Sequence, residues 1–135
     1  MPRSYSRIMV TGGAGFIGSH LVDRVLNRGY EVVVIDDLSE GRLENISRHL
    51  NNENFKFIEA DIRDSARVEA IVKDADAIFH EAAVVSVARS LEDPAYTNDV
   101  NVVGTLNLLK ACLNSNVKKF IYASSCAVYG EAESP

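Results

Sequence analysis

Short apolar runs recur along the chain, and within each run the apolar residues are continuous rather than alternating with polar ones. Continuous runs of this length are typical of strands that are buried on both faces, as in a parallel sheet covered by helices. The runs lie at residues 8–11, 32–35, 55–58, 77–80 and 120–123. The pattern therefore predicts a parallel sheet of about five strands.

Between these runs, apolar residues recur at the three- and four-residue intervals of one helix face. A first set comprises Ile17, Leu21 and Val25, a second Val68, Ile71 and Val72, and a third Val103, Leu106, Leu109, Cys112 and Leu113. Gly29 follows the first set as a stop signal, and Asp64 precedes the second as a candidate N-cap. The alternation of strand and helix predicts an α/β fold with a doubly wound parallel sheet and flanking helices.

Length and composition indicate a single domain. The chain has 135 residues, of which 47% are hydrophobic and 24% charged, and these proportions are typical of a folded domain. The net charge is −5 and the basic residues form no cluster, so we expect no nucleic-acid partner. The apolar run near the N-terminus is too short for a signal peptide or a membrane span. We therefore expect a cytoplasmic protein with no membrane partner.

The two cysteines, Cys112 and Cys126, have neither metal-ligand spacing nor nearby histidines. This pattern favours reduced thiols and predicts no metal site. His80 ends an apolar run without an acidic partner in a recognisable motif, so we interpret it as a structural residue rather than a catalytic one. His20 and His49 occupy predicted helix-surface positions.

Three glycines, Gly12, Gly15 and Gly18, lie between the first predicted strand and the first predicted helix. Glycine allows a sharp turn there, a close approach of a pyrophosphate to the backbone, and tight packing of helix on strand. The helix N-terminus supplies free N–H groups for such an anion. Asp36 ends the second predicted strand, 21 residues after Gly15, where a carboxylate binds the ribose hydroxyls of NAD and repels the extra phosphate of NADP.

A simpler interpretation is that the glycines only form a turn and that Asp36 is a cap or a surface acid. The combination of strand, glycine turn, helix and terminal acid favours dinucleotide binding over this alternative. The expected architecture is therefore of the Rossmann type, with NAD as the cofactor.

The chain resembles the extended short-chain dehydrogenase/reductase family in several motifs that occur in the family's order. These segments are TGGAGFIGSHLV, DDLSEG, DIRD, HEAA, NVVGTLNLLKAC and SSCAVYG. Within that family, the chain is most similar to the NAD-dependent nucleotide-sugar epimerases. The resemblance implies NAD as the cofactor and a nucleotide sugar, with a UDP-hexose favoured, as the substrate.

By position in these motifs, the resemblance implies a set of cofactor-binding residues. Around the pyrophosphate, ribose and adenine they are Gly12, Gly15, Phe16, Ile17, Gly18, Asp36, Asp37, Leu38, Ser39, Gly41, Asp61 and Ile62, and farther along the cofactor Ala82, Ala83, Val84, Asn101 and Ser124. In this pattern Asp61 accepts a hydrogen bond from the adenine amino group, and Asn101 braces the helix behind the site. The alternatives are that Asp61 caps a turn and that the alanines only pack.

The resemblance also places substrate chemistry in the segment SSCAVYG. Ser125 matches the family's catalytic serine or threonine, which hydrogen-bonds the sugar hydroxyl that is oxidised, and Ser124 contacts the nicotinamide side through its backbone. Ser86 resembles a residue that meets the sugar, although Ala88 replaces a proline that is often present there, which leaves the sugar open. Without the family, two serines after a strand more often form a helix cap or a turn.

The family's other catalytic residues form a Tyr-x-x-x-Lys motif, in which the ammonium lowers the pKa of the phenol so that the phenolate acts as a base. No tyrosine of this chain is followed by a lysine four residues later, and Tyr129 is followed by Glu133. We therefore expect residues 1–135 to be an NAD-binding domain that stops at Pro135, before this motif and the substrate-binding region, and to be inactive alone.

The expected function of the parent protein is 4-epimerisation of a nucleotide sugar through transient oxidation at C4 to a 4-keto sugar. Cys126 and Ala127 stand where dehydratases and decarboxylases of the family commonly place acids, which favours epimerisation. The alternatives are a dehydratase or reductase of the same family and a non-catalytic dinucleotide-binding module. We expect a homodimer that pairs through the helix at residues 103–113, as the family does, or an oligomer formed through the open edge of the fifth strand.

Overall fold

The carboxyl ends of five parallel strands meet at one edge of a single sheet. The computed structural model describes residues 5–131, and its strands are β1 (Arg7–Thr11), β2 (Glu31–Asp36), β3 (Phe55–Glu59), β4 (Ala77–His80) and β5 (Lys119–Tyr122). They pair in the order β3-β2-β1-β4-β5. Each predicted strand is confirmed, and each predicted bound lies within one residue of the observed one. The predictions that involve residues 1–4, Glu133 and Pro135 lie outside the described residues.

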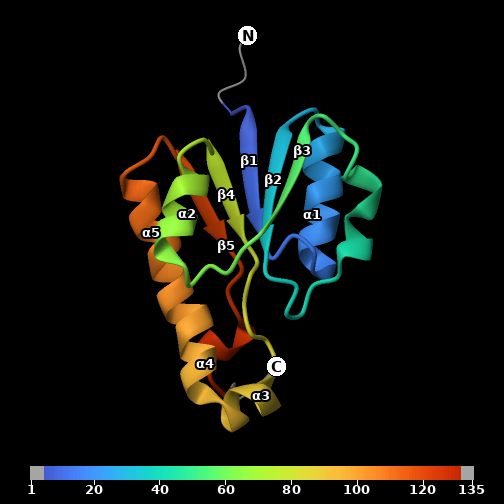
Figure 1. The fold of residues 1–135 in the computed structure, drawn as a ribbon. Coiled ribbons are helices and arrows are strands. Elements are labelled where there is room, and N and C mark those ends of the chain that lie inside the picture. Colours follow the sequence, from blue (N-terminus) through green and yellow to red (C-terminus); the bar gives the residue numbers. More distant parts are fainter. Residues whose placement is uncertain (1–4, 132–135) are drawn as a thin grey trace.

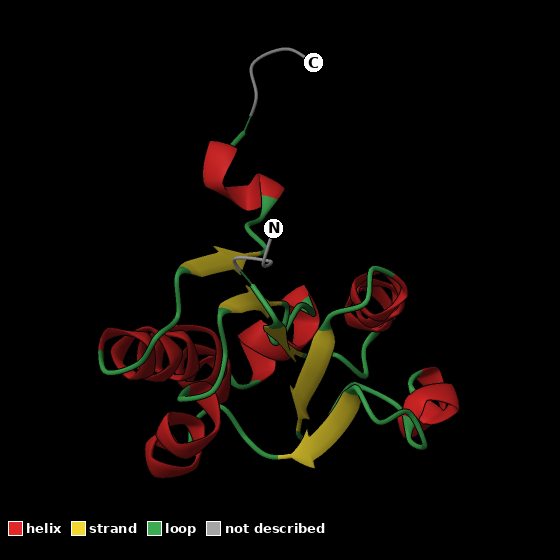
Figure 2. Ribbon diagram, turned by 90° about the horizontal axis from the view of Figure 1, so that it is seen from above, coloured by secondary structure: helices red, strands yellow, loops and turns green. Residues whose placement is uncertain are grey.

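Helices cover both faces of this sheet (Figure 1, Figure 2). The longest, α1 (Phe16–Asn27), lies on one face, and α2 (Ser65–Val72) and α5 (Thr105–Leu113) lie on the other. The short helices α3 (Val87–Glu92) and α4 (Pro94–Asn98) lie beyond the carboxyl ends of the strands (Figure 1). The remaining helical turns are η1 (Leu43–Asn45), η2 (Ser47–His49), the π-helical η3 (Asp99–Gly104) and η4 (Cys126–Tyr129). This arrangement confirms the doubly wound α/β fold.

Both faces of β1 are buried, which explains why its sequence is continuously apolar. Successive side chains of a strand point to opposite faces of the sheet. Ile8 and Val10 belong to the cluster that includes Val22 of α1, whereas Met9 belongs to the cluster on the other face, with Leu108 of α5. The strand thus contributes to two cores, one on each side of the sheet.

The predicted helix signals at Asp64 and Gly29 are both confirmed. The carboxylate of Asp64 accepts a hydrogen bond from the backbone N–H of Arg67 at 3.1 Å and caps α2. Gly29 follows the C-cap of α1 with φ 76°, a backbone conformation that glycine adopts without strain. These local signals fix where two of the helices begin or end.

The third predicted helix is present, but its apolar stripe is not its buried face. Within α5, the buried residues are Leu108 and Ala111. The residues that marked the helix in the sequence are mostly exposed: Val103, Leu106, Leu109 and Leu113. Helix α5 therefore packs on the sheet and α2 along one side and leaves a second apolar side uncovered by the described residues.

Strand β5 forms an edge of the sheet within residues 5–131. It pairs only with β4 there, and Ile121 and Tyr122 are exposed. Phe120, by contrast, is partly buried and packs against the core cluster that includes Met9 and Leu108. Among the described residues, no helix has the length and apolar character needed to cross a membrane.

Candidate functional site

A cleft of about 820 Å³ opens at the carboxyl ends of the strands. Most of the residues that the sequence singled out line it: Gly12, Gly15, Phe16, Ile17, Gly18, Asp36, Asp37, Ser39, Gly41, Asp61, Ile62, Ala82, Ala83, Val84, Asn101, Ser124 and Ser125. Two predicted residues, Leu38 and Ser86, are not among the lining residues. The fold therefore gathers segments from β1, β2, β3, β4 and β5 around one space.

Leu38 and Ser86 do not line the cleft, but each holds a segment that does. The backbone N–H of Leu38 donates to Asp36 at 2.9 Å, and its side chain packs against the α1-side core. Ser86 caps α3, since its hydroxyl accepts a hydrogen bond from the N–H of Arg89 at 3.2 Å. Both residues shape the segments that carry lining residues.

The glycine turn is packed too tightly for side chains at two of its positions. Gly12 has φ 67°, and a Cβ on it would lie 2.7 Å from the backbone nitrogen of Ala82. A Cβ on Gly18 would overlap the carbonyl oxygen of Gly12. At Gly15, by contrast, the only neighbouring atom is that same carbonyl oxygen at 3.2 Å. The first and third glycines serve packing, and the middle one leaves the backbone accessible.

The N-terminus of α1 is open toward the cleft. Gly15 is the N-cap and provides no side-chain hydrogen bond, so the first N–H groups of the helix lack the partner that a capping side chain would give. Gly15, Phe16, Ile17 and Gly18 all line the cleft. A helix N-terminus with bare backbone attracts an anion, because its N–H groups and its dipole both favour negative charge.

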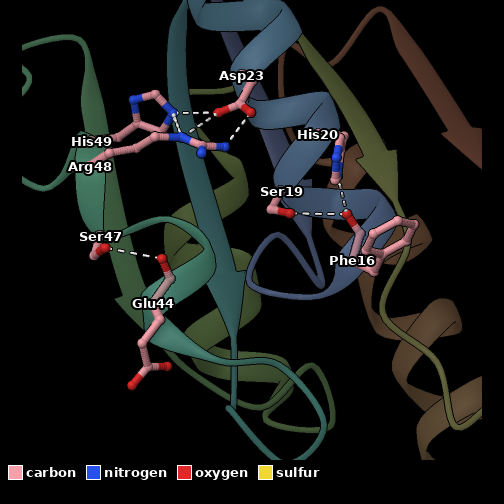
Figure 3. Close-up of polar contacts among 8 residues, drawn as sticks. All are labelled: Phe16, Ser19, His20, Asp23, Glu44, Ser47, Arg48 and His49. Carbon is pink, nitrogen blue, oxygen red and sulfur yellow. Dashed lines mark hydrogen bonds and ion pairs between the residues drawn. The ribbon is translucent and has the colours of Figure 1, made fainter.

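Two side chains brace the first turn of α1 (Figure 3). The hydroxyl of Ser19 and the Nδ1 of His20 both contact the carbonyl oxygen of Phe16, at 2.9 and 2.8 Å. The His20 ring also lies 4.8 Å from the exposed ring of Phe16, measured between centroids. These contacts, one from buried Ser19 and one from exposed His20, hold the start of the helix in place.

Asp36 is buried at the end of β2, with 7% of its surface exposed. One carboxylate oxygen accepts the N–H of Ala14 and the other accepts the N–H of Leu38, both at 2.9 Å. Burial raises the pKa of this carboxyl, although the two backbone hydrogen bonds oppose the shift. Each carboxylate oxygen accepts two hydrogen bonds, so one acceptor position on each oxygen is still available.

The segment after β2 is anchored to the outside of α1 (Figure 3). Arg48 and His49 of η2 both contact the carboxylate of Asp23, with His49 Nε2 at 2.6 Å from Oδ1. Burial alone would raise the pKa of Asp23, but the hydrogen bonds from His49 and Arg48 bring it below its usual value. The anchor holds the segment that carries Asp37, Ser39 and Gly41 along the cleft.

Asp61 holds an arginine from its own turn. Its carboxylate accepts from the backbone N–H of Arg63 at 2.8 Å and forms an ion pair with the Arg63 guanidinium at 2.5 Å. These hydrogen bonds lower the pKa of Asp61. The guanidinium groups of Arg63 and Arg89 lie 4.8 and 4.9 Å from the ring centroid of Tyr96, and Arg89 also pairs with Glu40. Side chains from the loops after β2 and β3 and from α3 and α4 thus meet beside this end of the cleft.

Small residues after β4 form one wall of the cleft, the 82–84 wall. Ala82, Ala83 and Val84 line the cleft, and Val84 is held by the side chain of Asn101. The Asn101 amide accepts the N–H of Val84 at 2.8 Å and donates to its carbonyl at 3.0 Å. Asn101 therefore braces this wall from η3, the helix behind it.

Ser124 and Ser125 extend the cleft beyond β5. Ser125 caps η4, because its hydroxyl accepts the N–H of Ala127 at 3.1 Å. This contact is the helix cap that the alternative interpretation expects, and it leaves the hydroxyl proton of Ser125 available for donation. Tyr129, the last residue of η4, is largely exposed.

Several lining residues were not singled out from the sequence as parts of a site. They are Ile35, Glu40, Ala60, His80, Glu81, Val85, Tyr96, Val100, Thr105, Tyr122 and Ala123. Glu40 could have been found, since it lies between Ser39 and Gly41. Thr105 lies four residues after Asn101, one helical turn away, whereas Tyr96 reaches the cleft only because α4 folds over it. Among the described residues, no group of three or more metal-binding side chains occurs.

A sequence model described as the NAD dependent epimerase/dehydratase family matches residues 8–135. The match covers the glycine turn, Asp36 and both walls of the cleft. The chain belongs to this family.

Known members with similar sequences differ in the reaction that their names describe. The UDP-glucose 4-epimerase of Mycolicibacterium smegmatis is 47% identical over 92% of this chain and 40% of its own length. UDP-glucuronic acid decarboxylase 4 of Arabidopsis thaliana is 42% identical over 97% of this chain and 28% of its own length. The UDP-glucose 4-epimerase of Thermus thermophilus, solved in complex with NAD, has a TM-score of 0.79 and 43% identity over 88% of this chain and 37% of its own.

The predicted resemblance to the epimerases is therefore confirmed, and the chain spans less than half the length of these family members. The cleft offers N–H donors at the start of α1, free acceptor positions on the Asp36 carboxylate and a hydroxyl at Ser125. Each of these groups is placed by a different strand end.

Proposed function

We propose that this chain binds NAD in the cleft and forms the NAD-binding part of a nucleotide-sugar 4-epimerase, with a UDP-hexose as the substrate of the longer protein. The observation that carries the proposal is the hydrogen bond between Asp36 and the N–H of Ala14. It joins the acid that would bind the ribose to the turn that would bind the pyrophosphate. Two halves of a dinucleotide site are thereby held at a fixed separation.

The residues of the cleft fit a pyrophosphate and a ribose diol. The open α1 N-terminus and the accessible backbone at Gly15 supply donors and space for the pyrophosphate. Asp36 keeps one free acceptor position on each carboxylate oxygen, which matches the two hydroxyls of a ribose. A 2′-phosphate would bring negative charge against this buried carboxylate, so NAD is preferred over NADP.

The remaining predicted residues have complementary roles in this proposal. Asp37, Leu38, Ser39 and Gly41 enclose the adenosine half, and Asp61 and Ile62 meet the adenine. Ala82, Ala83 and Val84 allow the cofactor to lie close to the backbone, with Asn101 as their brace. Ser124 then meets the nicotinamide side.

In the epimerisation, bound NAD supplies the oxidising equivalent for C4 of the sugar. The hydroxyl of Ser125 accepts the N–H of Ala127, so it can still donate a hydrogen bond to the sugar hydroxyl at C4, whose own proton leaves to a base. Ser86 lies at the start of α3, where it would meet the sugar. No tyrosine here has a lysine four residues later, so we propose that these residues alone bind the cofactor without turning over the sugar.

A second candidate is a decarboxylase or dehydratase of the same family. The 42% identity to the Arabidopsis UDP-glucuronic acid decarboxylase favours it. Against it, Cys126 and Ala127 follow Ser125, and neither side chain supplies the acid that an elimination uses. Epimerisation is therefore the preferred reaction. Independently of the reaction, we propose that the protein is located in the cytoplasm.

Calorimetric titration tests cofactor binding. The chain is titrated with NAD and with NADP at one salt concentration, and binding of NAD at least tenfold tighter than NADP supports the proposal. Equal affinities would contradict the assignment of Asp36, and no binding of either would contradict the dinucleotide site.

A product assay on the full-length protein tests the reaction. It is incubated with UDP-glucose and, separately, with UDP-glucuronic acid, and products are separated by chromatography. UDP-galactose from the first substrate supports epimerisation, whereas carbon dioxide and a UDP-pentose from the second support decarboxylation. Tight NAD binding with neither product supports the non-catalytic module.

A further inference from the structure

His80 is a buried histidine at the end of β4 that the proposed reaction does not use. It is 6% exposed, and both of its ring nitrogens have partners. Nδ1 lies 2.6 Å from the hydroxyl of Thr11, and Nε2 lies 2.8 Å from the hydroxyl of Thr105. The ring of Phe120 lies 5.7 Å away, between centroids. These contacts agree with the interpretation of His80 as a structural residue.

The hydroxyl partners determine which ring nitrogen carries the proton. Thr105 donates its single hydroxyl proton to the carbonyl oxygen of Asn101 at 2.7 Å, because a carbonyl only accepts. His80 Nε2 must therefore donate to Thr105. In a neutral imidazole the other nitrogen is then an acceptor, so Thr11 donates to Nδ1. The network assigns the Nε2–H tautomer to His80.

This network ends on the wall of the cleft at two places. On one side, the hydroxyl of Thr11 accepts the N–H of Ala82 at 3.3 Å, and Ala82 packs directly on Gly12. On the other side, Thr105 bonds to the backbone of Asn101, whose side chain holds Val84. His80 thus lies between the two attachments of the 82–84 wall.

We propose that His80, as the Nε2–H tautomer, is a positioning residue that sets the distance between the 82–84 wall and the glycine turn and thereby determines cofactor affinity. The inference rests on the proposed NAD site. Its physical basis is that a directed chain of hydrogen bonds in a buried site has one arrangement, whereas a broken chain leaves a polar atom unpaired. The 82–84 wall would then lose its register against Gly12.

Nuclear magnetic resonance tests the tautomer without any ligand. The chain has three histidines, so long-range ¹H–¹⁵N spectra of the histidine-labelled protein are simple to assign with single variants. At pH 7, His80 is expected to show a protonated Nε2 and an unprotonated Nδ1. An Nδ1–H tautomer or a doubly protonated ring would overturn the inference, whatever the protein binds.

Matched substitutions at Thr11 test the effect on the cofactor. Thr11→Val keeps the shape and removes the hydroxyl, and Thr11→Ser keeps the hydroxyl. NAD affinity measured by calorimetry should fall about tenfold in Thr11→Val, because Nδ1 loses its donor, and should recover in Thr11→Ser. The His80 spectrum should change in the Val variant and return in the Ser variant.

The outcomes separate this inference from the proposed function. If the unsubstituted chain binds NAD and Thr11→Val binds it equally well, the positioning role is overturned and the NAD site stands. If the unsubstituted chain does not bind NAD, both are overturned. If Thr11→Val does not fold, the spectrum of the unsubstituted protein still decides the tautomer, and comparing NAD affinities of Thr105→Val and Thr105→Ser replaces the comparison at Thr11.

Discussion

The carboxylate of Asp36 accepts a hydrogen bond from the backbone N–H of Ala14 at 2.9 Å. The bond joins the end of β2 to the glycine turn after β1, across 22 residues of sequence. The second carboxylate oxygen accepts from Leu38 in the following loop. A change at Asp36 therefore acts on the turn, on the loop and on the proposed ribose site together.

Asp36→Asn is expected to weaken NAD binding at least tenfold. Asparagine keeps one acceptor oxygen and replaces the other with an NH₂ donor, so one of the two backbone N–H groups loses its partner. The same loss should lower the free energy of unfolding by about 1–3 kcal/mol. Calorimetry and urea unfolding measure the two effects. Asp74→Asn, at an exposed acid outside the cleft, is the control and should bind NAD normally; unchanged NAD affinity in Asp36→Asn would refute the ribose assignment.

Gly15→Ala is expected to lose mainly NAD affinity, whereas Gly18→Ala is expected to lose mainly folding stability. A methyl at Gly15 meets only the Gly12 carbonyl oxygen, at 3.2 Å, and the φ of −75° suits alanine. Gly15→Ala should therefore lose less than about 1 kcal/mol of stability and still lose NAD affinity about tenfold or more, because the methyl occupies the approach of the pyrophosphate.

A methyl at Gly18 overlaps the carbonyl oxygen of Gly12, so the turn must shift to admit it. Gly18→Ala should lose about 1–3 kcal/mol of stability, as overpacked sites do. Urea unfolding followed by circular dichroism gives both free energies. Equal destabilisation by the two substitutions would show that the middle glycine is also a packing position.

Acid is expected to destabilise the protein through His80. Burial lowers the pKa of His80 from 6.5 to about 4. The unfolded chain therefore binds a proton between pH 6.5 and 4 that the folded protein does not, so stability falls as the pH falls through that range. From pH 7 to pH 5 the loss is about 2 kcal/mol.

His80→Gln supplies the comparison for this pH effect. The groups that contact His80 are the neutral side chains Thr11, Thr105 and Phe120. The neighbouring Glu81, whose pKa burial raises, is present in both proteins. Urea unfolding measures the loss of unfolding free energy from pH 7 to pH 5, and this loss should be smaller by about 2 kcal/mol in His80→Gln than in the unsubstituted protein. Equal losses in the two proteins would contradict a buried neutral His80.

Self-association of the chain is expected to use β5. This strand is the sheet edge within the described residues, with Ile121 and Tyr122 exposed, and unpaired edges invite pairing with another chain. Light scattering across a hundredfold range of concentration should show association that Ile121→Lys reduces. Leu113→Lys tests the exposed side of α5 instead, and greater reduction by that variant would favour helix pairing. A constant monomer mass would contradict both.

The strands, two helix limits and the glycine turn could be predicted because each depends on neighbouring residues. A strand buried on both faces is continuously apolar, as in residues 77–80, and a helix start is marked by an acid such as Asp64. The parallel orientation of the strands follows from their alternation with helices. Parallel strands bring their carboxyl ends to one edge, but the individual cleft residues came from the family's motifs, which did not include lining residues such as Tyr96 and Thr105.

The side chains that meet across the fold could not be predicted in the same way. Arg63 and Arg89 both reach Tyr96, and the tautomer of His80 depends on hydroxyls far from it in sequence. The buried face of α5 was also missed, because an apolar stripe shows that a helix has contacts but not which side the sheet occupies.

The amino-acid order by itself determined the strands, the glycine turn and the acid that ends β2, since backbone sterics and local burial act over a few residues. Only the tertiary structure decided that Asp36 bonds to Ala14 and that His80 links both attachments of the 82–84 wall. Such contacts depend on distances between segments, and those distances exist only once the sheet has assembled.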